Sequence, residues 1–289
     1  MHPIYKIVFY ISISLVIASI AIVSVYGLNF GVDFKGGTVM EIEFKNRPDL
    51  EDLQNVLRDN GEVSINYYGD NGAIIRTVEL SEEEHQVLLG KIRSKFEVEE
   101  KRFQSVGPVV GQELRNKSIV AIILVLTAII IYIAFVFRKL SKNLSPWAMG
   151  VAAIVALAHD ILIPLGIFSL LGKFYGVEIT AVFIAAVLTV LGYSVSDSVV
   201  VFDRVRENVI KGSKESFDAI VHKSVMQTLV RSINNTLTVV LSSAAIFFFG
   251  GDSIKYFALA LMLGIFLGAY SSIFVASPLL VAIHKRRIP

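Results

Sequence analysis

Asp197 is an acidic residue inside an apolar run, and its type and position are suited to ion or proton binding. The run TVLGYSVSDSVVVFDRVREN covers residues 189–208, and its first part is apolar enough to lie within a bilayer. A carboxylate inside a spanning helix costs at least about 2.5 to 3.5 kcal/mol on insertion scales, so such an acid normally faces a partner, a cavity or an ion path. We therefore expect Asp197 to bind a proton or another ion. The alternative is a structural polar contact between helices.

Polar neighbours of Asp197 are candidates for supporting roles. Thr189 and Tyr193 precede it at intervals of four residues, which predicts a polar stripe on one face of a helix. Charged residues follow from residue 203 onward, and a solvated helix end explains most of them. The residues assigned to this supporting set are Thr189, Tyr193, Ser194, Asp203 and Arg204.

Two further ionisable residues lie in other apolar runs. Asp160 lies beside His159 near the middle of the third run, as either a second station of a proton relay or a structural helix contact. Arg231 lies near the start of the fifth run, at nearly the depth of Asp197 if the two helices are antiparallel. Because an unpaired charge costs more in the membrane than a joined pair, we expect Arg231 to pair with Asp197. The alternative is an arginine that extends to the inner interface.

The composition places these residues in a membrane protein. Of 289 residues, 54% are hydrophobic and 18% are charged, which is too apolar for a soluble domain. The chain has no cysteine, which excludes disulfides and thiolate metal sites, and we expect no metal and no cofactor. Basic residues lie at loop ends and not in patches interleaved with aromatic residues, so nucleic-acid binding is not expected. Enzymatic activity is not expected either.

The expected architecture is a polytopic α-helical membrane protein with six transmembrane helices. Six apolar runs are long enough to cross the hydrocarbon core: residues 4–28, 118–137, 147–171, 178–202, 226–249 and 256–283. The first helix thus occupies residues 1–28 and the other five occupy residues 117–289, with loops at 138–146 and 203–225. Both loops and the C-terminus are rich in Lys and Arg, so the positive-inside rule places them and both termini in the cytoplasm.

Residues 29–116 form an acidic insert between the first two helices, with 11 Lys and Arg against 17 Asp and Glu. Its apolar residues alternate between the period of strands and the period of helices. The order β-α-β-β-α-β predicts a small ferredoxin-like α/β domain with two helices on one face of the sheet: strands at 38–44, 63–68, 73–78 and 96–106, and helices that begin at Pro48 and Ser81. With both termini inside, this domain lies outside the cell membrane.

The last apolar run has a small residue at every fourth position, which lets a neighbouring helix approach closely. The positions are Ala260, Gly264, Gly268, Ser272 and Ala276. We assign helix packing above all to Gly264 and Gly268. The pattern leaves open whether the neighbouring helix belongs to this chain or to a partner.

The run GYSVSDSVVVFDRVREN, residues 192–208, resembles the signature of the SecF family of prokaryotic protein-export membrane proteins. Four more segments extend the resemblance over nearly the whole chain: GVDFKGGT, VGPVVGQEL, ALAHD and FGGDSIKYFALALMLGIFLGAYSSIF. The resemblance implies one six-helix half of an RND-type transporter, with an external domain after the first helix. Asp197 matches the intramembrane aspartate of the family, and Arg231 falls where a functionally important arginine is expected.

The resemblance also implies partners and a function. The partners are SecD, which supplies the other six helices, the SecY protein-conducting channel, preprotein substrates and the lipid of the cell membrane. The implied function is the use of an ion gradient, of protons or of sodium, to drive preprotein translocation on the external side. A proton fits Asp197, because a change in the charge of a buried acid changes which helix packing is favoured.

Two other classes of function remain open. A small-molecule or lipid exporter of the RND superfamily would need a roomy apolar pocket in the external domain, or a groove that faces the membrane. A non-transporting assembly factor of the translocon would tolerate loss of the acidic group of Asp197.

Overall fold

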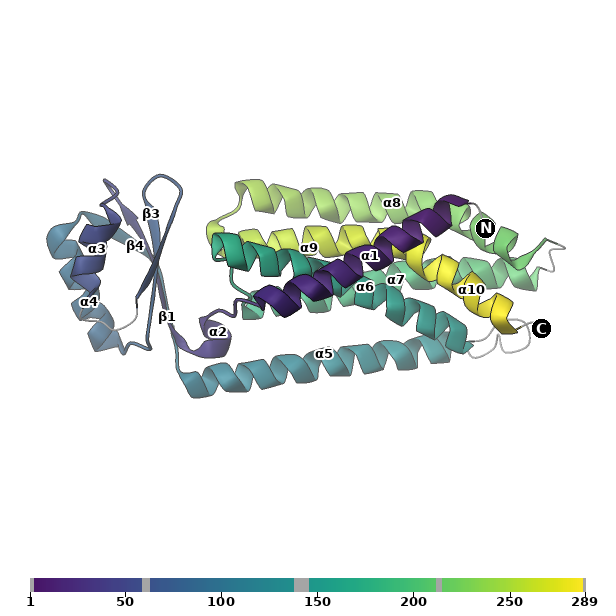
Figure 1. The fold of residues 1–289 in the computed structure, drawn as a ribbon, viewed down its shortest axis with the longest axis horizontal. Helices are drawn as coiled ribbons and strands as arrows, with labels where there is room; N and C mark the ends of the chain where they lie inside the picture. Colours follow the sequence, from purple (N-terminus) through teal and green to yellow (C-terminus); the bar gives the residue numbers. More distant parts are fainter. Residues whose placement is uncertain (1–2, 59–62, 138–145, 212–214, 288–289) are drawn as a thin grey trace. The chain divides into compact units, whose positions relative to one another are not determined.

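The computed structural model (Figure 1) describes four stretches of the chain: residues 3–58, 63–137, 146–211 and 215–287. Its contacts divide the chain into a helical unit and a sheet-containing unit. The helical unit comprises residues 1–28, 120–177 and 182–289, and the sheet-containing unit comprises residues 29–119 and 178–181. Apart from Pro146, the loop expected at 138–146 lies outside the described residues.

The structure confirms six helices long and apolar enough to cross a membrane within the described ranges. They are α1 (Pro3–Tyr26), α5 (Pro108–Val136), α6 (Pro146–Tyr175), α7 (Ala181–Ile210), α8 (Phe217–Phe249) and a last span built from α9 (Asp252–Ser271), η3 (Ser272–Ala276) and α10 (Ser277–Arg287). Helices α7 and α8 extend into the loop expected at 203–225. Ion pairs three or four residues apart, such as Arg204 with Glu207, stabilise the added turns of α7.

The last span contains a π-helical turn that hydropathy did not predict. Pro278 follows this turn and lacks the N–H that an unbroken α-helix would use there. Serine hydroxyls satisfy nearby carbonyls, since Ser277 Oγ donates to the carbonyl of Ser272 at 2.8 Å and Ser272 Oγ donates to the carbonyl of Gly268 at 2.7 Å. Such turns often occur at functional sites, and this one directly follows Ser271.

The interior of the helical unit forms mainly from α6, α7 and the last span. About half of the most apolar window of each is buried, 56% for α6 and 50% for the other two. The corresponding windows of α1, α5 and α8 are only 11%, 6% and 17% buried. These three helices therefore leave most of their surface for lipid or for a partner.

Small residues bring α9 close to α7 of the same chain. A Cβ atom added at Gly264 would overlap the side chain of Val190, and one added at Gly268 would lie 3.1 Å from Ser194 Cβ. The structure thus gives an intrachain neighbour to both glycines assigned to helix packing.

We expect Gly264→Leu to destabilise the helical unit, because overpacking a tight contact costs about 1 to 3 kcal/mol or more. Thermal unfolding of the chain in mild detergent would measure this as a lower midpoint temperature. Gly192→Leu is the matched control on α7, since a Cβ atom there meets no atom within 4 Å. Equal losses of stability in both variants would contradict the assigned contact.

The sheet-containing unit has the predicted ferredoxin-like arrangement. Strands β1 (Gly37–Phe44), β2 (Ser64–Tyr68), β3 (Gly72–Thr77) and β4 (Val98–Val106) form an antiparallel sheet in the order β2-β3-β1-β4. Helices α3 (Leu50–Leu57) and α4 (Glu82–Lys95) cover one face of it (Figure 1). Alternate residues of β1, including Met40 and Ile42, pack against Leu53 of α3 and Leu88 of α4.

Two glycines set the course of the chain into this sheet. Gly36 and Gly37 follow the short helix α2 (Val32–Lys35) and have φ angles of 80° and 118°. A Cβ atom at Gly36 would lie 2.8 Å from Pro108 Cα, and one at Gly37 would lie 2.8 Å from the carbonyl oxygen of Thr77. Both positions therefore require glycine.

Candidate ion-coupling site

Asp197 lies on α7, and its side chain reaches α8. The residue is 9% exposed, and Ser232 Oγ donates a hydrogen bond to Asp197 Oδ1 at 2.5 Å. Asp197 Oδ2 is buried and accepts no hydrogen bond from the part of the chain that the structure describes. An oxygen buried without a donor is costly, and binding a proton or a cation there removes that cost.

Two hydroxyl groups complete a polar cluster around Asp197. Tyr193 lies one turn before Asp197 on α7, and Thr236 lies one turn after Ser232 on α8. The Tyr193 hydroxyl lies near Thr236 and interacts electrostatically with Asp197, but neither the Tyr193 nor the Thr236 hydroxyl forms a well-aligned hydrogen bond within the described ranges. We call these four side chains the α7–α8 cluster: Tyr193, Asp197, Ser232 and Thr236.

Arg231 lies beside this cluster in sequence but outside it in space. It is exposed, and it forms no ion pair with any described acidic residue. Consecutive helical residues point about 100° apart, so α8 turns Ser232 toward Asp197 and Arg231 to another direction. The expected pairing of Arg231 with Asp197 stays a prediction for another conformation.

Asp160 lies on α6 in a second polar cluster. It is 1% exposed, and its Oδ2 atom accepts hydrogen bonds from Ser194 Oγ at 2.5 Å and from Ser271 Oγ at 2.8 Å. Its Oδ1 atom lies 2.9 Å from His159 Nδ1. One carboxyl group thus joins side chains from α6, α7 and α9.

His159 extends this second cluster toward α1. Its ring stacks on Tyr270 at 5.7 Å between centroids, and the Tyr270 hydroxyl lies 2.9 Å from Ser12 Oγ. His159 Nε2 is buried and has no hydrogen-bond partner among the described residues. Asp160 therefore has the surroundings of either a relay station or a structural contact, and both interpretations of it remain.

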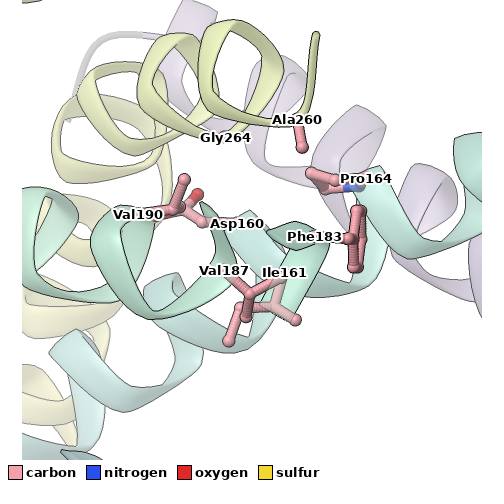
Figure 2. Close-up of a pocket in the computed structure, with 8 residues that line it drawn as sticks. All are labelled: Asp160, Ile161, Pro164, Phe183, Val187, Val190, Ala260 and Gly264. Atoms are coloured by element: carbon pink, nitrogen blue, oxygen red, sulfur yellow. The ribbon is translucent and has the colours of Figure 1, made fainter. Parts of the chain in front are cut away.

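A small cavity adjoins Asp160 between α6, α7 and α9 (Figure 2). Its volume is about 10 Å³, roughly the space that one water molecule needs. Eight residues line it, and all but Asp160 are apolar: Asp160, Ile161, Pro164, Phe183, Val187, Val190, Ala260 and Gly264. The cavity is far too small for a drug-sized ligand, which needs about 300 to 1,000 Å³.

The supporting residues expected from sequence are spread over several places. Tyr193 belongs to the α7–α8 cluster, whereas Ser194 bonds to Asp160. Thr189 is exposed, and its hydroxyl donates to the carbonyl of Ala185 at 2.8 Å. Asp203 and Arg204 form ion pairs along α7, Asp203 with Arg206 and Arg204 with Glu207, as expected for a solvated helix end.

Several members of these clusters were not predicted. Ser232, Thr236 and Ser271 are serine and threonine residues in apolar helices, where hydroxyls often bond to their own backbone, so residue type alone does not single them out. The sequence signal that could have found two of them is the spacing of four residues between Ser232 and Thr236, which places both on one face of a helix. Within the described ranges, no group of three or more His, Asp and Glu residues could hold a metal ion.

Two family descriptions match this chain. Residues 88–286 match the family described as protein export membrane protein SecD/SecF, C-terminal, and residues 21–46 match the SecD/SecF GG motif. The protein translocase subunit SecF of Thermobaculum terrenum is 44% identical to this chain, covering 96% of it and 92% of that protein. The subunit of the same name from Anaerolinea thermophila is 36% identical, covering 94% and 90%.

Two solved structures are also similar. The crystal structure of SecDF from Thermus thermophilus, described as a translocon-associated membrane protein, matches with a TM-score of 0.85 and 35% identity. A crystal structure of SecDF in a super-membrane-facing form matches with a TM-score of 0.69 and 34% identity. Each match covers 98% of this chain, which spans 38% of the SecDF chain.

Proposed function

Since this chain belongs to the SecD/SecF family of protein-export membrane proteins, and its relatives are SecF translocase subunits, we propose that it couples an ion gradient to preprotein export. In this proposal it works with a SecD subunit beside a SecY-type channel, in a transport role without catalysis. The observation that carries the proposal is the buried Asp197 Oδ2, which has no donor among the described residues. An acid in that setting suits the uptake and release of a proton.

Protonation of Asp197 would change the packing of α7 on α8. The neutral acid is compatible with the buried α7–α8 cluster, whereas the carboxylate is stabilised by a nearby guanidinium such as that of Arg231. Alternation between these two environments lets a proton enter from one side and leave to the other. Each proton that crosses 100 mV releases about 2.3 kcal/mol, which is available for movement. The oxygen-rich cluster leaves sodium as the alternative coupling ion.

A polar face of α8 supports a second membrane subunit as partner. Arg231, Asn234 and Asn235 are exposed in the isolated chain, although they lie within a helix apolar enough to span the bilayer. Polar and charged side chains in a spanning helix normally face protein or a water-filled cavity and not lipid. We propose that the SecD subunit covers this face, in line with the 38% of SecDF that this chain matches.

The two cavities in the structure give little support to the alternative function, export of a small molecule or lipid. The cavity beside Asp160 has the volume of about one water molecule. The sheet-containing unit has an open groove of about 710 Å³, and four charged residues are among those that line it: Lys35, Arg76, Glu79 and Glu178. A hydrophobic substrate would need a more apolar pocket.

Reconstitution of the chain with SecD and a SecY-type channel in vesicles would test this function. We expect an imposed proton gradient to accelerate completion of preprotein translocation, and a protonophore to remove that acceleration. Acceleration that resists the protonophore and disappears with a sodium ionophore would identify sodium. Translocation that is insensitive to both ionophores would favour the assembly factor.

The proposed orientation places both termini in the cytoplasm and residues 29–116 outside. Because the chain has no cysteine, single cysteines report accessibility without background. We expect a membrane-impermeant maleimide to label Asn71→Cys only from outside and Lys211→Cys only from the cytoplasmic side; Lys211 is exposed and Asn71 is half-buried in a turn. Labelling of Asn71→Cys from the cytoplasm would overturn the topology.

A further inference from the structure

Both carboxyl oxygens of Asp160 have partners within the helical unit. Its Oδ2 atom accepts hydrogen bonds from Ser194 of α7 and Ser271 of α9, and its Oδ1 atom lies 2.9 Å from His159 Nδ1. Asp197 differs, because its Oδ2 atom has no donor among the described residues. A carboxyl group whose oxygens are already paired gains less from binding an ion than one with an unpaired oxygen. Asp197 is therefore suited to ion uptake, and Asp160 is suited to holding helices together.

Regular helical hydrogen bonding is interrupted close to Asp160 on two of the three helices that it joins. Pro164 of α6 has no N–H to donate to the carbonyl of Asp160, four residues earlier. On the last span, the π-helical turn begins at Ser272, directly after Ser271. Prolines and π-helical turns are the usual places where helices bend. The carboxyl group of Asp160 thus links two interrupted helices to α7, which is a continuous α-helix.

Ser194 brings this link close to Asp197. The two residues are three positions apart on α7, about 4.5 Å along the helix axis and about 60° around it. Ser194 Oγ donates to Asp160 of α6 at 2.5 Å, and Asp197 Oδ1 accepts from Ser232 of α8 at 2.5 Å. These two bonds hold neighbouring sides of α7 to two different helices. A rotation of α7 that breaks the first bond also turns Asp197 relative to Ser232.

We infer that Asp160 is a positioning residue, which through Ser194 holds α7 at the rotation where Asp197 meets Ser232. The inference rests on the proposed function, because it concerns the site at which Asp197 takes up a proton. In this role Asp160 acts as a hydrogen-bond acceptor, and transport does not require it to exchange a proton.

Two substitutions of Asp160 separate this role from that of a proton relay. The asparagine oxygen can accept both serine hydroxyls, and its amide can donate to His159 Nδ1 when the ring carries its proton on Nε2. In the reconstituted complex we therefore expect Asp160→Asn to keep gradient-driven ion flux and export near their original rates. Alanine has no acceptor, so Asp160→Ala should lower both rates about tenfold. A relay would instead make Asp160→Asn as inactive as Asp160→Ala.

Infrared spectroscopy of the purified complex with SecD gives a signature of Asp197 itself. The relevant band is the C=O stretch of the protonated Asp197 carboxyl group, which is assigned by its loss in Asp197→Asn and reports the hydrogen bonding of that group. We expect Ser194→Ala to shift this band in the same direction as Ser232→Ala does, because Asp197 loses its alignment with Ser232. Asp160→Asn should leave the band in place. A general loss of stability would lower the unfolding temperature without shifting it.

Ser169→Ala is the matched control on α6. Ser169 is 2% exposed, and its hydroxyl donates to the carbonyl of Gly27, just after α1, at 2.5 Å. Its loss also removes a hydrogen bond between two segments of the helical unit, but one that does not involve α7. Ion flux, export and the Asp197 band should therefore stay as they are in the unaltered complex.

Three outcomes would overturn the inference while the proposed function stands: loss of flux in Asp160→Asn, full flux in Asp160→Ala, or an unshifted Asp197 band in Ser194→Ala. If Asp160→Ala does not assemble with SecD, Asp160→Asn and Ser194→Ala still decide the question. Absence of gradient-dependent flux in the unaltered complex would refute the proposed function and this inference with it.

Discussion

Asp197→Asn is expected to leave the complex assembled and to abolish both gradient-driven export and ion flux. Asparagine has nearly the same shape, and its amide oxygen can still accept the hydrogen bond that Ser232 Oγ donates to Asp197 Oδ1. It cannot bind and release a proton. Copurification with SecD measures assembly, and vesicle assays under an imposed gradient measure the two activities.

Ser232→Ala is the companion variant for this experiment. It removes the hydrogen bond to Asp197 but retains the acid, so we expect reduced flux and export, with both still above the level of Asp197→Asn. Full activity of Asp197→Asn would move the coupling role to Asp160 or favour the assembly factor. Asp160→Asn in the same assay decides between those two outcomes.

Much of the architecture was predictable because its signals are local. Apolar runs longer than about 20 residues define the spans, since backbone polar groups in lipid must bond within their own helix. The β-α-β-β-α-β order predicts the ferredoxin-like sheet. Ser81, where the second helix was expected to begin, caps α4 by accepting a hydrogen bond from Glu84 N. Helix ends were less predictable. α5 begins at Pro108, ten residues before the expected span, because proline is favoured at the first helical position.

Of the residues in the two polar clusters, the acidic residues were the ones that the sequence made predictable. Asp197 and Asp160 are costly in apolar runs, so their presence alone is a signal. Their partners Ser232 and Ser271 come from other helices, and those contacts depend on how each helix is rotated about its axis. The expected depth of Asp197 in the membrane identified the correct part of α8. It did not show which residue of α8 faces Asp197, because that depends on the rotation of the helix about its axis. The same limit hid the contact of Asp33 with Ala181, two residues 148 positions apart in the chain.

The two SecDF structures resemble this chain to different degrees. Both match nearly all of this chain, yet their TM-scores of 0.85 and 0.69 show that the two differ from each other over the matched region. A chain that adopts more than one arrangement can offer Asp197 more than one environment. We propose that Arg231 approaches the acid in one arrangement and faces away from it in another.

Arg231→Leu is accordingly expected to reduce gradient-driven export nearly to the level of Asp197→Asn, and Arg231→Lys to reduce it less. Leucine removes the charge that stabilises the ionised acid, whereas lysine keeps the charge and loses the planar guanidinium that binds a carboxylate through two hydrogen bonds. Both variants should fold, because Arg231 is exposed and packs in neither buried cluster. Export rates under a fixed gradient, with ion flux measured in parallel, give the comparison.

Arg206→Leu is the control, since it removes a guanidinium from the same chain at an exposed helix end, where Arg206 pairs with Asp203 at 2.9 Å. Ion pairs of that kind contribute about 0 to 1 kcal/mol, so export should stay near its original rate. If Arg231→Lys and Arg231→Leu were equally impaired, geometry and charge would both be required at this position. If Arg231→Leu retained full export, the acid would release its proton without a cationic partner, and Ser232 and Tyr193 would be the remaining groups able to stabilise the carboxylate.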